Sequence, residues 1–236
     1  MSEWTEADGT FDQFQATKTG LFVGIFTLLI TVILEAISIP SVRVIVAAPG
    51  GHALYAQAWC FTILNSIMWG PLIYGLVAHL FVYDRACSGP VPCLLATAGR
   101  VSGLLLIHSI GYWYAHKTMH TSWLFWAHSF HHRFSAAVTP CVAMAVSPAE
   151  FLLAYMVPFI VGGLIVRPDR LSLLLAVCII SLSNLMVHTE RCQGWNLPWF
   201  LVSADKHLQH HRRPNKHYAA PTLDVDAILL QVRRRY

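Results

Sequence analysis

Long apolar segments constrain the fold of this chain more than any other feature of its sequence. A helix that crosses a bilayer needs about 20 mostly apolar residues. Five segments approach or reach that length, namely 21–39, 58–82, 94–113, 151–166 and 171–187. Only 12% of the 236 residues are charged, whereas a soluble domain usually carries about 25%. The sequence therefore predicts an all-α integral membrane bundle. The predicted bundle has five transmembrane helices, or four if Arg100 and His108 prevent residues 94–113 from crossing the membrane.

The chain shows no internal division, because no polar linker or low-complexity stretch separates one part from another. We expect a single structural domain, with generic spans in residues 1–95 and the chemical motifs in residues 96–236. Residues 167–170 (Arg-Pro-Asp-Arg) predict a tight turn between the last two spans, and Pro148 suits the first turn of the fourth. Gly70-Pro71 predicts a kink in the second span. Residues 195–202 suit an interfacial segment, because Trp favours the headgroup level.

Histidine is the most unusual component of the sequence, with thirteen copies against sixteen Lys and Arg together. Histidines three or four positions apart on a helix share one face of it. Imidazoles collected in this way commonly bind a transition metal. The segment 151–187 leaves and returns to one side of the membrane, so the early and late clusters are expected to meet. Nine histidines fall into ligand-like groups: His116 and His120; His128, His131 and His132; His188; and His207, His210 and His211.

Nine imidazoles are more than one metal ion needs, because a four-coordinate zinc ion would use only three or four of them. Two metals with four or more imidazoles each, and room for an exogenous ligand, match the number better. Imidazole suits iron, copper, nickel and zinc, so ligand type alone does not choose the metal. Few acids lie nearby, namely Glu150, Glu190 and Asp205. They are candidates to orient the imidazoles by accepting the second ring N–H. Asp205, two positions before His207, is the first choice.

The order and spacing of these motifs resemble the fatty acid hydroxylase/sterol desaturase superfamily over residues 108–226. The motifs are Tyr-Trp-Tyr-Ala-His116-Lys-Thr-Met-His120, His128-Ser-Phe-His131-His132, Pro148-Ala-Glu150, His188 and Asp205-Lys-His207-Leu-Gln-His210-His211. The superfamily pattern is HxxxH, HxxHH and a late HxxHH, with a helical hairpin between the last two. The resemblance implies a membrane non-haem di-iron oxygenase with the nine histidines as metal ligands in a cytosolic cap. Its cofactor is two iron ions, for which zinc can substitute in preparations.

The chain departs from the superfamily pattern at two histidines. His217-Tyr-Ala219 stands where the family usually has Asn-Tyr-Gly, and His108 stands near a position that is often acidic. We treat both histidines as candidates for an additional metal ligand or for a residue that contacts the ligands.

The expected activity is that of an oxidoreductase, a dioxygen-dependent hydroxylase or desaturase acting on a sterol or fatty acyl type lipid in the membrane. Electrons must come from an external donor, cytochrome b5-like or ferredoxin-like, since the sequence contains no haem, flavin or ferredoxin motif. Basic residues are in excess on the histidine side, which predicts that this side is cytosolic. The membrane would be the endoplasmic reticulum in a eukaryote or the inner membrane in a bacterium. No basic tract interleaved with aromatic residues supports nucleic-acid binding.

Three other functions were weighed against this one. A carotenoid hydroxylase or ketolase would use the same chemistry on another apolar substrate. A histidine-rich metal transporter would need ionisable residues along a path at mid-membrane, whereas these histidines gather at helix ends. A catalytically inactive lipid-binding member would be expected to lack some of the motif histidines, and all are present. The enzyme is the best supported of these functions.

Overall fold

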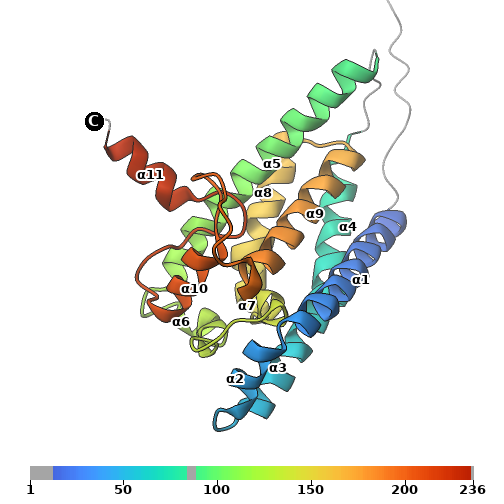
Figure 1. Ribbon diagram of the computed structural model, residues 1–236. Helices are drawn as coiled ribbons and strands as arrows, with labels where there is room; N and C mark the ends of the chain where they lie inside the picture. Colours follow the sequence, from blue (N-terminus) through green and yellow to red (C-terminus); the bar gives the residue numbers. More distant parts are fainter. Residues whose placement is uncertain (1–12, 84–88, 235–236) are drawn as a thin grey trace, which may run out of the picture.

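Helices make up most of the computed structural model, which describes residues 13–83 and 89–234 (Figure 1). Five helical stretches are long and apolar enough to cross a membrane, at 13–37, 51–81, 90–119, 148–166 and 170–187. Within the described residues no strand is present, only an isolated antiparallel bridge between Leu201 and Leu223. The predicted all-α membrane bundle is confirmed, with five spans of suitable length.

The first two spans pack closely side by side. Helix α1 (Gln13–Ile37) lies along α4 (Gly70–Phe81), and α2 (Ile39–Ala47) and α3 (Gly51–Leu64) connect them through a π-helical turn, η1 (Asn65–Trp69). A Cβ atom on Gly24 would lie only 1.9 Å from the carbonyl oxygen of Ser66. Glycine is therefore required at this crossing, as small residues often are where membrane helices approach closely.

Helix α5 (Pro90–Met119) packs against the hairpin formed by α7 (Pro148–Glu150), η4 (Phe151–Met156), α8 (Val157–Val166) and α9 (Arg170–Val187). The turn between α8 and α9 places Arg167 in the left-handed region, at φ 49°. Asp169 then caps α9 by accepting a hydrogen bond from the Ser172 backbone N–H at 2.8 Å. Asp169 also pairs with Arg100, which explains how this arginine is accommodated in α5. The predicted hairpin turn is confirmed.

Two π-helical segments interrupt the spans, and each one precedes a proline. Pro71 comes two residues after η1 ends at Trp69, and Pro158 comes two residues after η4 ends at Met156. Proline has no N–H, and its ring clashes with the carbonyl four residues earlier, so the regular α-helical hydrogen bonding cannot continue. The irregularity predicted at Gly70-Pro71 therefore lies just ahead of it, at Asn65–Trp69. The second interruption was not predicted.

Short helices form a cap over one end of the bundle, where α5 and α9 finish (Figure 1). They are α6 (Phe125–His128), η2 (His131–Arg133), η3 (Pro140–Met144), η5 (Glu190–Cys192) and α10 (Ala204–Arg212). Helix α11 (Val225–Arg233) contacts α5 and projects from the side of the molecule (Figure 1). Residues 195–202 contain no helix, and Trp195 and Trp199 are exposed, as expected for an interfacial segment. The proposed boundary near residue 95 stays a prediction, although α4 packs against α8 and α1 against α9 across it.

Candidate metal centre

Nine histidines come together in the cap as two neighbouring groups. The five-histidine group consists of His116, His120, His128, His132 and His210. The four-histidine group consists of His131, His188, His207 and His211. Within each group, one ring nitrogen per residue lies within 4.8 Å of all the others. The structure thus brings together all nine histidines that the sequence singled out, and divides them into two sets.

Helix ends position most of these rings. His116 lies in the last turn of α5 and His120 is its C-cap, whereas His188 is the C-cap of α9. Both helices end at the same side of the bundle, as the hairpin topology predicted. Helix α10 supplies three further rings, and the Ser203 side chain caps its start by accepting from the Lys206 N–H at 3.3 Å. The start of α10 is therefore fixed by an ordinary side-chain cap.

Backbone carbonyls determine which ring nitrogen faces the centre of each group. The Nδ1 atoms of three histidines donate to carbonyl oxygens at 2.8 Å: His116 to Tyr218, His210 to Lys216, and His188 to Asn184. A carbonyl oxygen can only accept, so each of these Nδ1 atoms carries a hydrogen. The Nε2 atom of each neutral ring consequently presents a lone pair to the centre.

These lone pairs converge at distances that two acceptors do not tolerate by themselves. His116 Nε2 lies 2.9 Å from His128 Nε2, whose own ring donates through Nδ1 to Glu150. When the Glu150 carboxylate is ionised and accepts the Nδ1 hydrogen of His128, neither Nε2 atom has a hydrogen to share and no hydrogen bond forms between them. A cation placed between the lone pairs removes the repulsion, and neutral imidazole is a common metal ligand. The donor set therefore fits a metal ion.

The four-histidine group shows the same convergence. His188 Nε2 and His207 Nε2 are 2.9 Å apart, and His207 Nε2 lies 3.2 Å from His211 Nε2. His188 donates through Nδ1, so its Nε2 atom is an acceptor facing this cluster. All four residues are buried. A second metal ion would satisfy this set of nitrogens as well.

Burial keeps the rings in the form that binds metals. Removal from water, together with a smaller contribution from nearby His210, lowers the pKa of His120 and His132 to about 3. The same effect of burial lowers the pKa of His188 and His210 to about 4. These imidazoles are neutral at pH 7, and metal binding requires the unprotonated nitrogen.

Glu150 is the acid that contacts a ligand-like histidine. Its side chain is fully buried, and its Oε1 atom accepts from His128 Nδ1 at 2.7 Å. Asp205 was the first choice for such a role, but its carboxylate accepts from the Gly194 N–H at 2.9 Å. Residues two apart on a helix point to nearly opposite sides, so Asp205 faces away from His207. Glu190 contacts Ser41 instead of an imidazole.

The two remaining candidate histidines lie outside both groups. His108 is buried two helical turns before His116 on the same face of α5, and its Nδ1 atom has no partner. His217 is partly buried beyond α10, with φ 58°. Sequence reasoning missed the three carbonyls that orient His116, His188 and His210. It had no signal for them, because every residue carries a carbonyl.

Comparison with known proteins places these motifs in a family. The family model for fatty acid hydroxylase matches residues 101–229, more than half of the chain. The chain is also 32% identical over 127 residues to fatty acid hydroxylase ahd1 of Mycosarcoma maydis, covering 52% of this chain and 31% of that protein. The chain thus spans about a third of the length of this relative. No solved structure gives a significant match. On the strength of the family match and the arrangement of its histidines, the chain belongs to the fatty acid hydroxylase family.

Proposed function

We propose that this protein is a di-iron, dioxygen-dependent hydroxylase or desaturase that acts on a lipid within the membrane. Membership of the fatty acid hydroxylase family supports oxygenase chemistry on a lipid. The convergence of ring nitrogens in two adjacent histidine groups, with the Nε2 atoms of His116, His188 and His210 held inward, is the observation that carries the proposal. The nine histidines of those groups would be the metal ligands.

The chemistry of the reaction would be supplied by two iron ions when bound, which together activate dioxygen to attack an unactivated C–H bond. The protein contributes geometry and exclusion of water. Carbonyls at Tyr218, Lys216 and Asn184 hold three rings with Nε2 inward. Complete burial of the four-histidine group keeps bulk water from that side.

Glu150 would act as a positioning residue for the five-histidine group. Its carboxylate accepts the Nδ1 hydrogen of His128, which fixes the ring tautomer and increases the basicity of Nε2. The Ser147–Glu150 turn holds the carboxylate in place, because the Ser147 side chain accepts from the Glu150 N–H at 3.1 Å. Glu150 would thus help to retain the metal and to orient the His128 ring.

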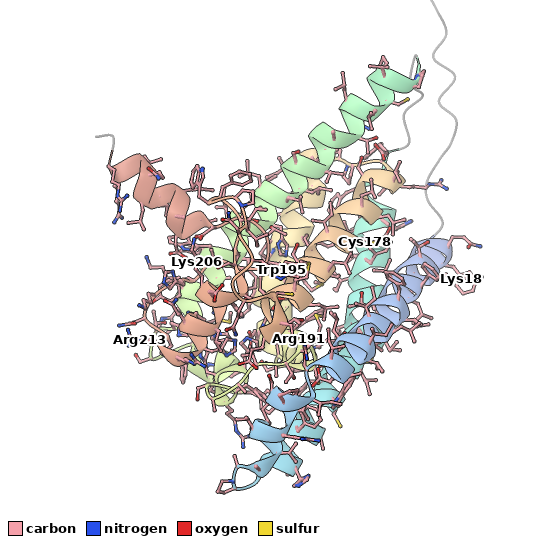
Figure 2. All side chains as sticks on the ribbon, in the orientation of Figure 1. Lys18, Cys178, Arg191, Trp195, Lys206 and Arg213 are labelled. Atoms are coloured by element: carbon pink, nitrogen blue, oxygen red, sulfur yellow. The ribbon has the colours of Figure 1, made fainter. Side chains whose placement is uncertain are left out.

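Electrons would come from a separate protein, cytochrome b5-like or ferredoxin-like. Such donors are often acidic, and basic side chains surround the cap. Figure 2 shows Lys206 and Arg213 at the cap, far from Lys18 at the start of α1. The cap would face the cytosol, from the endoplasmic reticulum in a eukaryote or the inner membrane in a bacterium. Full turnover by purified protein with NAD(P)H alone would contradict the need for a donor.

The test of the proposed function is the metal content of detergent-purified protein, measured by elemental analysis together with Mössbauer spectroscopy on iron-57-grown cells. About two irons per chain in a coupled site would support the proposal. Zinc alone calls for anaerobic reconstitution with ferrous iron, because zinc can displace iron during expression. Failure to take up any iron after reconstitution would overturn it.

A further inference from the structure

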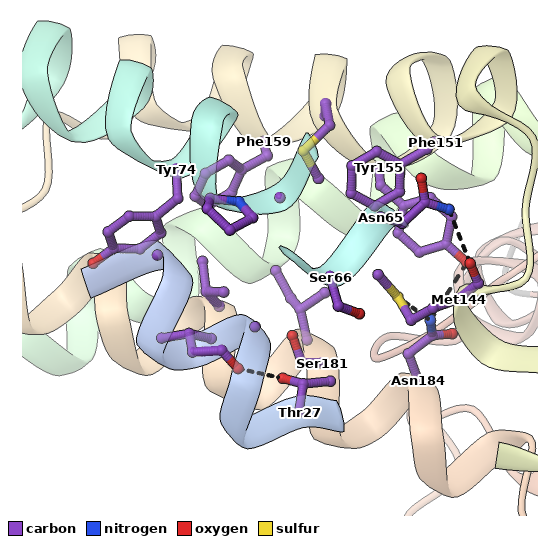
Figure 3. Close-up of a pocket in the computed structure, with 18 of the residues that line it drawn as sticks. Thr27, Asn65, Ser66, Tyr74, Met144, Phe151, Tyr155, Phe159, Ser181 and Asn184 are labelled. Atoms are coloured by element: carbon purple, nitrogen blue, oxygen red, sulfur yellow. Dashed lines mark hydrogen bonds between the residues drawn. The ribbon is translucent and has the colours of Figure 1, made fainter. Parts of the chain in front are cut away.

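A cavity lies inside the bundle, separate from the two histidine groups (Figure 3). It is bounded by α1, the η1–α4 segment, α5, the η4–α8 segment and α9. Most of its lining is apolar, and Tyr74 and Phe159 lie toward one end, whereas Met144 and Asn184 lie toward the other (Figure 3). Both π-helical segments contribute to the lining. Such segments frequently occur at functional sites.

Four polar atoms of the cavity lining are buried without a hydrogen-bond partner. They are Asn65 Oδ1, Ser66 Oγ, His108 Nδ1 and Asn184 Oδ1. Their residues are between 0% and 4% exposed. Buried polar atoms are nearly always hydrogen-bonded, and an unmade bond in an apolar region is costly. Four such atoms around one cavity indicate that a bound molecule completes their hydrogen bonds.

The two asparagines present acceptors only. Asn65 Nδ2 donates to the carbonyl oxygens of Met144 and Val146 at 2.9 and 3.0 Å. Asn184 Nδ2 donates to the carbonyl oxygen of Ala143 at 2.9 Å. These carbonyls accept only, so each amide must turn its NH₂ group toward them and leave Oδ1 free. A molecule that pairs with either amide oxygen must therefore offer a hydrogen-bond donor.

The polar end of the cavity lies close to the histidine groups. Asn184 precedes His188 by one helical turn, and the Asn184 carbonyl accepts from the His188 ring at 2.8 Å. Tyr112 and Tyr155 stand between the cavity and His116, with ring centroids 5.1 Å apart from one another and 5.2 Å between Tyr112 and His116. A molecule held by the polar atoms would have its polar end next to the metal centre.

We propose that this cavity is the substrate site and that the substrate is a neutral lipid bearing a hydroxyl group. This inference rests on the proposed function. A hydroxyl group donates to an amide oxygen or to His108 Nδ1 and accepts from Ser66 Oγ, so one group can serve both kinds of partner. A carboxylate would face the two amide oxygens without a counter-charge, since no Lys or Arg is among the described lining residues. The apolar lining matches the hydrocarbon part of such a lipid.

The experiment compares three probes of equal chain length on the purified, iron-loaded protein in lipid nanodiscs. Binding of radiolabelled 1-decanol, decanoate and decane is measured by equilibrium dialysis at pH 8, where the acid is charged. We expect 1-decanol to bind at least about tenfold more tightly than the other two, the equivalent of one good hydrogen bond. Equal binding of the three probes, or no binding of 1-decanol, would overturn the proposal and leave ordered water as the partner of the polar atoms.

Two variants test the polar atoms themselves. Ser66→Ala and His108→Phe each remove an unpartnered atom with little change in shape, and each is expected to weaken 1-decanol binding about three- to tenfold. Decane binding should be unchanged. The matched control is Thr31→Val, because the Thr31 hydroxyl is buried in α1 outside the cavity and already donates to the Thr27 carbonyl at 2.8 Å. Unaltered 1-decanol binding in both variants contradicts the assignment.

Failure of this inference can be told apart from failure of the proposed function. Iron in a coupled site together with indiscriminate probe binding would remove the cavity assignment and leave the oxygenase standing. Selective 1-decanol binding by protein that takes up no iron would support the cavity as a lipid site and overturn the oxygenase.

Discussion

The two histidine groups differ in how their rings are held and in how far water reaches them. In the five-histidine group, Nδ1 of His116, His128 and His210 bonds to Tyr218, Glu150 and Lys216, and two members, His120 and His132, are only partly buried. In the four-histidine group every member is buried, but only His188 has a partner for Nδ1. His131, His207 and His211 have none.

The difference teaches that the same residue type can be positioned by two physical means. Directed hydrogen bonds fix the orientation of three rings in the five-histidine group, those of His116, His128 and His210, where solvent is close. Packing within a sealed space does so in the four-histidine group, where no water competes for the nitrogen atoms. We expect the five-histidine group to be the side at which small molecules and metals exchange, and the four-histidine group to retain its metal longer.

The largest effect should come from removing one ring from either group. His210→Ala and His131→Ala are each expected to lower activity by more than about 100-fold. That loss is larger than the loss typical of residues that only contact a metal ligand. Each should also lower iron content from about two to about one per chain, because each group would bind its own ion. Iron and activity are measured on protein of equal membrane yield. The control is His52→Ala, at an exposed histidine outside both groups. Full activity in His131→Ala or His210→Ala would contradict the site.

A smaller effect is expected from Glu150, which supports only the five-histidine group. Glu150→Ala leaves the His128 Nδ1 hydrogen without its acceptor in a fully buried position. Loss of such a partner typically lowers metal affinity or activity by about 10–100-fold. Glu150→Gln keeps an acceptor oxygen and should lose less.

The readout for Glu150 is the Mössbauer signal, in which one of two iron sites should change and the other should not. Glu190→Gln is the matched acid control, because Glu190 contacts Ser41 and no imidazole. Equal changes at both iron sites would mean that the two groups are not supported independently.

The two groups should lose their iron to a chelator at different rates. A water-soluble chelator at pH 7.5 is expected to extract iron in two phases, with the partly exposed five-histidine group emptied several-fold faster. Iron remaining in the protein is followed over time together with its spectrum. A single phase that removes both ions together would break the comparison between an accessible and a sealed group.

The smallest effect is expected at His217, which lies outside both groups. Its ring is partly exposed, and His217→Ala should change activity by no more than about threefold while leaving two irons per chain, in line with surface substitutions generally. Loss of an iron in this variant would show that the ring moves to join a group when metal binds.

Much of the fold could be predicted from the sequence, because a bilayer imposes length and polarity on every segment that crosses it. Five apolar segments, the turn at residues 167–170 and the helix start at Pro148 all follow from local composition. The placement of Arg100 was harder, since its partner Asp169 lies far away in sequence. The π-helical turn before Pro158 was also missed, because proline interrupts a helix without specifying how the backbone adapts.

The sequence by itself determined that nine histidines in ligand-like spacings meet at one end of a five-span bundle. Only the tertiary structure decided how they divide. His131 and His132 join different groups, as do His210 and His211, because successive helical side chains point about 100° apart. The two HxxHH motifs therefore each serve both groups, whereas the HxxxH pair His116 and His120 serves only the five-histidine group. The same holds for the acids: spacing favoured Asp205, but the packing of α7 against α6 brought Glu150 to His128.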